Sequence, residues 1–306
     1  MELSIVTTMY DSAPYLEEFY SRICTAAEKI TSNYEIIFVN DGSPDNSLEI
    51  AINLYERDKG IKIVDLSRNF GQHKAMMMGL AQAKGELIFL IDCDLEEEPE
   101  LLGEFHSEMV SSGVDVVYGV RDRRKGRVIE RATGWIFYKL FNMLSSVPIA
   151  ANPLNARLMS QRYVGNLLQH REREFFMAGL WEITGFKQTS VVAPKHSKGT
   201  SSYSIGRKIS IFVNAITSFS NKPLVMIFYL GCVILLVSSV VALYLIIMRL
   251  FFRVFFSGWA SLIVSIWLLA GMIIFSLGIL GIYLSKIFIE TKKRPYAVVR
   301  KIYDHD

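Results

Sequence analysis

Two uncharged stretches in the last third of the chain constrain its fold more than any other feature. Residues 224–248 and 261–285 each run for 25 residues without Asp, Glu, Lys or Arg. A helix needs about 20 apolar residues to cross the hydrocarbon layer of a bilayer. The alternative is a pair of core helices, but buried helices of this length rarely lack a polar face. The sequence therefore predicts two transmembrane helices within residues 223–286.

Basic residues flank this pair of stretches on both outer sides. Three precede the first stretch and six follow the second: Arg207, Lys208 and Lys222, then Lys286, Lys292, Lys293, Arg294, Arg300 and Lys301. The connecting loop holds only Arg249 and Arg253. Since Lys and Arg concentrate on the cytoplasmic side of a membrane, we expect a multi-pass protein of the cytoplasmic (inner) membrane. Residues 1–222, the basic tail 287–306 and both termini would face the cytoplasm.

Composition and motif content exclude several other classes of protein. The net charge of +3 is small and no basic run is interleaved with aromatic residues, so we expect no nucleic-acid partner. Three isolated cysteines argue against a disulfide scaffold and fit a reducing compartment. The first residues lack the basic and apolar regions of a signal peptide. Neither a G-x-x-x-x-G-K-[ST] loop nor a G-x-G-x-x-G after the first strand is present, which disfavours a P-loop kinase or a dinucleotide oxidoreductase.

The first 120 residues alternate between apolar runs and segments with helical spacing. The predicted strands cover residues 3–8, 35–40, 61–66, 86–91 and 114–118, and the predicted helices cover residues 13–29, 46–57 and 72–83. Asp45 is the expected cap of the second helix. This alternation predicts an open α/β sheet with right-handed crossovers, in which ligands bind beyond the carboxyl ends of the strands. We therefore expect one rim to be lined by four pairs of residues: Thr7/Thr8, Asn40/Asp41, Ser67/Arg68 and Asp92/Asp94.

The fourth predicted strand ends in Asp92-Cys93-Asp94, and Glu96 follows. Mg²⁺ and Mn²⁺ take carboxylate oxygens and keep positions open for phosphate oxygens. We therefore expect Asp92, Asp94 and Glu96 to hold Mg²⁺ or Mn²⁺. Such a metal would bridge the diphosphate of a nucleotide sugar and neutralise charge as the leaving group departs. Cys93 is expected to pack under the sheet.

Several motifs occur together in an order that resembles a known family. They are Ser4-Ile-Val-Thr-Thr-Met-Tyr10, Phe38-Val-Asn-Asp-Gly-Ser43, Leu66-Ser-Arg-Asn-Phe-Gly71, Ile91-Asp-Cys-Asp-Leu-Glu96, Arg157-Leu-Met-Ser160, Gly199-Thr-Ser-Ser-Tyr203 and Glu290-Thr-Lys-Lys-Arg-Pro295. Over nearly its whole length the chain is similar to the family 2 (GT-A fold) polyprenyl-phosphate glycosyltransferases, such as bactoprenol glucosyltransferases and dolichyl-phosphate mannose synthases. The resemblance implies a Rossmann-like nucleotide-sugar domain with amphipathic membrane-surface helices, followed by the two transmembrane helices.

The resemblance also implies the substrates and the residues that bind the donor. The donor would be a nucleoside-diphosphate sugar, with a UDP-linked sugar favoured, and the acceptor a polyprenyl phosphate lipid. Asp41 matches the family's nucleotide-base contact, and Asp92 matches the acid near the ribose and diphosphate. Asp94 and Glu96 occupy the metal-ligand positions, although glutamine is more usual at the second. Arg68 is either a contact to the base or diphosphate or part of a surface salt bridge.

On the acceptor side, Arg157 and Arg173 match arginines that face the acceptor phosphate. A second acceptor segment departs from the family pattern at two positions, with His196 for arginine and Ser202 for lysine; its expected phosphate contacts are His196, Lys198, Ser201, Ser202 and Tyr203. Asn155 stands where an acid is often proposed as catalytic base. A phosphomonoester has a second pKa of about 6, so a lipid phosphate is largely a dianion at neutral pH and needs no base. We expect Asn155 to orient the acceptor or a sugar hydroxyl.

These features predict an inverting, single in-line displacement on the anomeric carbon, catalysed by positioning and charge stabilisation. Two alternatives stay open. A polymer-extending synthase of the same fold would usually carry more spans and a Q-x-x-R-W motif, which is absent here. An inactive homologue would bind lipid phosphate or nucleotide and regulate another membrane enzyme. The resemblance also allows a homo-oligomer.

Two segments are candidates for helices lying on the bilayer. Residues 135–144 favour the membrane surface over core packing, whereas for residues 209–219 the two interpretations are balanced. A basic stretch between Arg121 and Arg131 is expected to attract anionic headgroups.

Overall fold

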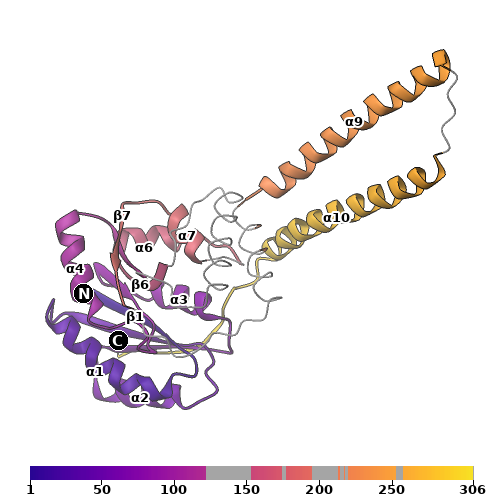
Figure 1. Cartoon of the computed structure of the whole chain (residues 1–306). Coiled ribbons are helices and arrows are strands. Elements are labelled where there is room, and N and C mark those ends of the chain that lie inside the picture. Colours follow the sequence, from indigo (N-terminus) through magenta and orange to yellow (C-terminus); the bar gives the residue numbers. More distant parts are fainter. Residues whose placement is uncertain are drawn as a thin grey trace.

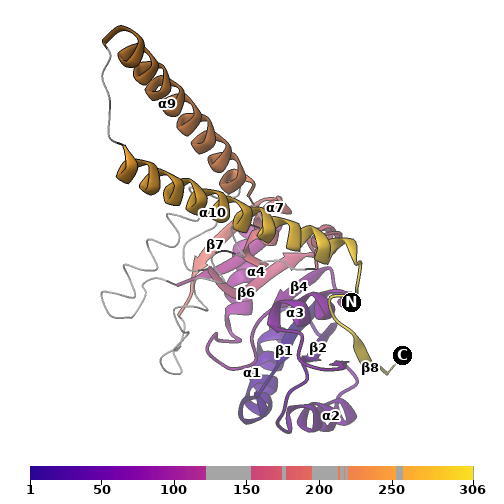
Figure 2. The ribbon, with the colours of Figure 1, turned by 90° about the vertical axis from the view of Figure 1, so that its right-hand side faces the viewer.

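The computed structural model describes residues 1–121, 153–173, 177–194, 213, 217, 220–252 and 258–305. Figure 1 shows a sheet domain from which two long helices project, and Figure 2 shows the same arrangement after a quarter turn. The expected helix at 135–144, nearly all of 209–219 and most of the basic stretch lie outside the described residues. The same holds for five predicted phosphate contacts: His196, Lys198, Ser201, Ser202 and Tyr203.

Eight strands form one mixed sheet in the order β7-β5-β6-β4-β1-β2-β3-β8. Their bounds are β1 Leu3–Met9, β2 Tyr34–Asn40, β3 Ile61–Leu66, β4 Leu87–Leu90, β5 Val116–Val120, β6 Pro153–Ser160, β7 Gln188–Val192 and β8 Val299–Tyr303. The β1–β2, β1–β4 and β2–β3 pairs are parallel, as expected for strands joined by helices. β6 is antiparallel to both β4 and β5, and β8 is antiparallel to β3. The fifth strand, β5, begins two residues later than predicted.

Helices cover both faces of this sheet. Their bounds are η1 Ala13–Tyr15, α1 Leu16–Glu28, α2 Ser47–Arg57, α3 Gln72–Leu80, α4 Leu101–Ser112, α6 Gln161–Leu167 and α7 Met177–Ile183. One core cluster joins α1, α2 and α4 to one face, and a second joins α3, α6 and α7 to the other. Because apolar side chains are buried on both sides, all seven residues of β1 are buried. The predicted α/β class is confirmed.

Three local predictions need correction. The helix expected over residues 13–29 begins as a 3-10 turn, with Pro14 in its first turn, and becomes α-helical at Leu16. The helix expected to reach residue 83 ends at Leu80. The cap of α2 is Asn46 rather than Asp45, although an Asp45 oxygen does accept a hydrogen bond from the Ser47 backbone N–H at 3.1 Å.

The two long helices are α9 (Lys222–Phe252) and α10 (Trp259–Thr291). Within them, Lys222–Val241 and Ser265–Thr291 are long and apolar enough to cross a membrane, and none of either window is buried inside the protein. The bases of the two helices are bonded to each other, and the end of α10 contacts the sheet domain. The Tyr283 hydroxyl donates to the Ser220 carbonyl at 2.6 Å, and the Arg173 backbone N–H donates to the Glu290 carboxylate at 2.6 Å. The tail predicted only as a basic segment returns to the sheet as β8 (Figure 2).

A glycine at the end of β2 lets two rim loops approach closely. Gly42 has φ +61°, and a Cβ there would lie 2.5 Å from the Arg68 carbonyl carbon and the Asn69 nitrogen. Gly113 has nearly the same φ, +62°, but nothing lies within 4 Å of its Cβ position. The turn after β2 and the loop after β3 therefore pack backbone against backbone only because residue 42 has no side chain.

These two glycines form a matched pair for mutation. Gly113→Ala should destabilise the protein by about 1–2 kcal/mol, the cost of left-handed backbone for a residue with a Cβ. Gly42→Ala should cost clearly more, because it adds a backbone clash to the same strain. Thermal unfolding of both variants in the same detergent measures the difference. Equal losses would show that the two loops separate without cost.

Candidate active site

A pocket of about 250 Å³ opens at the carboxyl ends of β1, β2 and β4. Its lining residues are Thr8, Tyr10, Ser12, Asp41, Asn69, Gln72, Asp92, Cys93 and Asp94. Four of the eight predicted rim residues are thus brought together: Thr8, Asp41, Asp92 and Asp94. Arg68 is not among the lining residues. Its exposed side chain lies over the Phe70 ring at 4.2 Å and donates to the Asn69 carbonyl, while Asn69 itself faces the pocket.

Asp41 is the buried carboxylate of this pocket. Its two oxygens accept hydrogen bonds from the backbone N–H groups of Phe70 at 2.7 Å and Gly71 at 3.0 Å. Burial raises the pKa of Asp41 above its usual value, and the two N–H donors oppose that effect. The carboxylate therefore ties the loop after β3 to the end of β2, and places Asn69 between them on the pocket wall.

Asp92 is held between two side-chain amides. Its Oδ1 accepts from Gln72 Nε2 at 2.8 Å and its Oδ2 accepts from Asn155 Nδ2 at 2.8 Å. Asn155 was expected to orient the acceptor or a sugar hydroxyl, but in the structure its amide donates to the Asp92 carboxylate. An aspartate at that position would place a second carboxylate against the first. The amide is therefore the form that suits an ionised Asp92.

Sequence reasoning missed the residue that fixes Asn155 in place. Glu97 is completely buried, and its carboxylate accepts from the backbone N–H groups of Asn155 at 3.2 Å and Ala156 at 2.8 Å. On the carbonyl side of the same segment, Arg157 donates to Leu154 and Asn155, both at 3.4 Å. The backbone before and after Asn155 thus lies between a buried anion and a buried cation. Its place in the run Glu96-Glu97-Glu98 was the only signal for Glu97 in the sequence.

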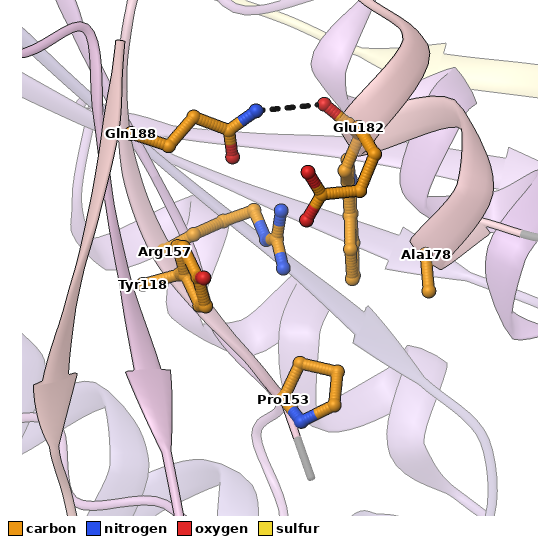
Figure 3. A pocket seen from close by; sticks show the side chains of 7 residues that line it. Tyr118, Pro153, Arg157, Ala178, Glu182 and Gln188 are labelled. Carbon is orange, nitrogen blue, oxygen red and sulfur yellow. Dashed lines mark hydrogen bonds between the residues drawn. The ribbon is translucent and has the colours of Figure 1, made fainter. Parts of the chain in front are cut away.

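Arg157 itself lies inside the domain and not on the rim. Its side chain is 2% exposed, and its guanidinium carbon lies 3.0 Å above the Trp181 ring. Figure 3 shows the guanidinium with the Glu182 carboxylate directed towards it. The surrounding cavity measures about 10 Å³, room for about one water molecule and too little for a phosphate. Packing on Trp181 encloses the charge in the described part of the chain, and the contact of Arg157 with the acceptor phosphate stays a prediction.

Burial lowers the pKa of Arg157 to about 9, so the guanidinium stays charged at neutral pH. Burial also raises the pKa of Glu182, against the attraction of Arg157. The second predicted phosphate arginine, Arg173, is half-buried beside the end of α10, where its backbone contacts Glu290. Within the described residues, Arg173 is not among those that line the cavity at Arg157.

Of the three carboxylates predicted to hold a divalent cation, two line the pocket. Asp92 and Asp94 line it, whereas Glu96 does not and instead donates its backbone N–H to Asp94 Oδ1 at 3.0 Å. Within the described residues, no group of three or more acidic, His or Cys side chains is gathered for a metal. Mg²⁺ is commonly held by one or two carboxylates with substrate phosphates completing the shell. The described lining contains three carboxylates and no Lys or Arg, so a diphosphate would need such a cation to enter.

Cys93 faces inward from the same segment. Its thiol donates to the Thr8 carbonyl at 3.1 Å, and burial raises its pKa to about 12. The expected packing role is therefore what the structure shows, and the thiol stays protonated at neutral pH.

Sequence comparisons with known proteins identify the family of the chain. Residues 4–168 match the family described as Glycosyl transferase family 2. A Mycobacterium tuberculosis protein described as a glycosyltransferase is 54% identical over 306 residues, which cover 100% of this chain and 90% of that protein. The uncharacterised glycosyltransferase YkcC of Bacillus subtilis is 35% identical over an alignment that covers 99% of this chain and 94% of that protein. Bactoprenol glucosyl transferase of Shigella phage SfII is 32% identical and covers 98% of each chain. The chain therefore belongs to glycosyl transferase family 2, as its motifs predict, and is a glycosyltransferase.

Proposed function

We propose that this glycosyltransferase moves a sugar from a nucleoside-diphosphate sugar to a polyprenyl phosphate, with inversion, at the cytoplasmic face of the membrane. One observation carries the proposal. The acidic pocket at the strand ends and two membrane-length helices belong to one body, because the end of α10 contacts the sheet domain through Arg173 and β8, and Ser220, just before α9, is bonded to α10. The similarity to a relative named bactoprenol glucosyl transferase supports a lipid-phosphate acceptor.

The donor would lie along the pocket from Asp41 to Asp94. Asp41 and Asn69 stand at the end proposed for a nucleotide base, with uridine favoured. Thr8 and Asp92 stand nearer the centre, where the ribose and diphosphate would lie. Bound Mg²⁺ or Mn²⁺ would supply positive charge for the diphosphate, with Asp94 and Asp92 as the carboxylates that hold it.

In the reaction, an oxygen of the lipid phosphate attacks the anomeric carbon, and the bond from that carbon to the nucleoside diphosphate breaks. The attacking phosphate is largely a dianion above its second pKa of about 6, so no protein base is required. Asn155 then acts through Asp92, by holding the carboxylate in one orientation and one charge state. The chain's contribution is chiefly to position the reactants.

The acceptor phosphate would approach from the side of α10. Arg173 lies against Glu290 at the end of that helix, and we propose that it contacts the phosphate with His196, Lys198, Ser201, Ser202 and Tyr203. A helix hairpin whose two bases are bonded to each other has both ends on the same side of a bilayer. This arrangement supports the cytoplasmic placement of both termini.

The role of Asp94 can be tested with three carboxylate variants. Asp94→Asn should lower sugar transfer by about 100-fold or more, because charge stabilisation at the leaving diphosphate is lost. Glu104→Gln, an exposed carboxylate on α4, should leave transfer unchanged. Glu96→Gln should lose less than about tenfold, since Glu96 does not line the pocket. The assay uses purified protein with Mn²⁺ or Mg²⁺, a panel of UDP- and GDP-sugars, and undecaprenyl or dolichyl phosphate.

Two results would contradict the proposal. Full activity of Asp94→Asn would remove the metal site from Asp94. An inactive wild-type protein that still bound undecaprenyl phosphate or nucleotide would favour the regulatory alternative, in which the chain controls another membrane enzyme.

The contact between Asn155 and Asp92 predicts a pH effect. In Asn155→Asp, a carboxylate would replace the amide that now lies 2.8 Å from Asp92 Oδ2. Repulsion between the two carboxylates would raise the pKa of the pair above the usual value of about 3.9. The folded variant would then bind more protons than the unfolded chain, so its stability should fall relative to wild type as pH rises from about 4 to 7. Thermal unfolding without divalent cations, at a series of pH values, measures this.

Asn155→Ala is the matched control, because it removes the hydrogen bond without adding a charge. Its stability relative to wild type should change little with pH. Parallel pH profiles for Asn155→Asp and Asn155→Ala would show that residue 155 and Asp92 do not interact.

A further inference from the structure

The chain segment that follows the helix hairpin forms part of the edge of the catalytic sheet. β8 pairs with β3 in register Ile63↔Tyr303, Val64↔Ile302 and Asp65↔Lys301, and the register then shifts so that Leu66 pairs with Val299. The shift leaves Arg300 as an extra residue in β8. A bulge of this kind turns a side chain to a new direction.

Arg300 reaches across to the carboxyl end of β3. Its Nη2 donates to the Ser67 carbonyl at 2.7 Å, and its Nη1 lies 3.4 Å from Asp65 Oδ2. Asp65 is 2% exposed, so its charge is largely removed from water. A buried carboxylate needs partners, and its other oxygen accepts from Asn40 Nδ2 at 2.8 Å. The guanidinium therefore lies at one end of a chain of contacts that runs from Arg300 through Asp65 to Asn40.

Both ends of that chain of contacts lead to the proposed donor pocket. Asn40 Oδ1 accepts from the Ser43 backbone N–H at 3.0 Å, which shapes the turn containing Asp41. Ser67 is bonded to the tail twice, because its N–H also donates to the carbonyl of Val298, the residue just before β8, at 2.9 Å. Ser67 begins the loop that carries Asn69 into the pocket wall. The loop is therefore held from inside by Asp41 and from outside by β8.

Other contacts attach the tail to the sheet independently of Arg300. The ammonium group of the buried Lys62 lies 2.7 Å from Asp304 Oδ2, and the Tyr55 hydroxyl donates to the Asp304 carbonyl at 3.0 Å. The Tyr55 ring stacks on His305 with centroids 3.9 Å apart. Because of these contacts, loss of the Arg300 side chain should leave β8 paired with β3.

We propose that Arg300 is a positioning residue for donor binding: it holds the turn after β2 and the loop after β3 in place through Asp65 and Ser67. The inference rests on the proposed function, since it assumes that the pocket binds a nucleotide. If Arg300 has this role, the donor site depends on the tail that follows α10. Arg300 touches no lining residue directly, so its effect should fall on donor affinity and not on the chemical step.

The test uses the full chain in detergent, with nucleotide binding measured calorimetrically with UDP or GDP and Mn²⁺, and sugar transfer measured with undecaprenyl phosphate. Arg300→Ala should weaken nucleotide binding and raise the donor KM by about tenfold, as expected for loss of hydrogen bonds from a charged group. The kcat and the KM for undecaprenyl phosphate should change less than about twofold. Lys301→Ala is the matched control, because the ammonium group of this neighbouring cation lies over the Tyr303 ring at 4.1 Å, and its loss should leave all these values unchanged.

A second variant separates positioning from a general loss of stability. Asp65→Asn keeps an oxygen for Asn40 but removes the charge that faces Arg300. If the pair acts as a unit, the double variant should bind donor about as weakly as the worse single variant. Additive losses, equal losses for donor and acceptor, or an Arg300→Ala protein that matches Lys301→Ala would overturn the inference. A wild-type protein that binds neither UDP nor GDP would instead refute the donor site, and with it the proposed function.

Discussion

The buried carboxylate of Glu97 bonds to the backbone N–H groups of Asn155 and Ala156, and the pocket depends on this contact more than on any other. It joins the segment after β4 to the beginning of β6, 58 residues further along the chain. A buried carboxylate without partners would cost several kcal/mol, so the two N–H groups and the acid stabilise one another only in this arrangement. Arg157 completes the enclosure from the carbonyl side. The result is that the Asn155 amide reaches Asp92.

The charges of the pocket follow a consistent pattern. Asp41 is bonded to backbone N–H groups, and Asp92 is bonded to the amides of Gln72 and Asn155. These neutral donors orient the carboxylates without cancelling their charge. A nucleoside diphosphate is itself an anion, so a pocket of this kind suits a donor that enters with Mg²⁺ or Mn²⁺. Arg157, the cation that the motif pattern places near the acceptor, is buried and packs on the Trp181 ring.

The helix hairpin and the catalytic domain are connected at two places: Glu290 with Arg173, and β8 with β3. The first contact lies where α10 meets the domain. The second lies at the edge of the sheet, beside the loop that carries Asn69. A lipid phosphate and a cytoplasmic nucleotide sugar can meet in one site only if the pocket is held at a fixed distance from the membrane. These contacts support the proposed function because they hold the helix hairpin against the domain that contains the pocket.

The sequence by itself determined the features that arise from local periodicity. The long uncharged runs became α9 and α10, and the apolar runs became β1 to β4, whose parallel pairing brought Thr8, Asp41, Asp92 and Asp94 to one rim. Only the tertiary structure decided the rest. β6 and β8 are joined to their partners by antiparallel pairing between distant segments, which no local pattern reveals. The pairing of β6 places Arg157 on Trp181 and the Asn155 amide beside Asp92. The pairing of β8 places Arg300 beside Asp65. A motif states which charged residue is present, but its partner and its burial are set by segments far away in the sequence.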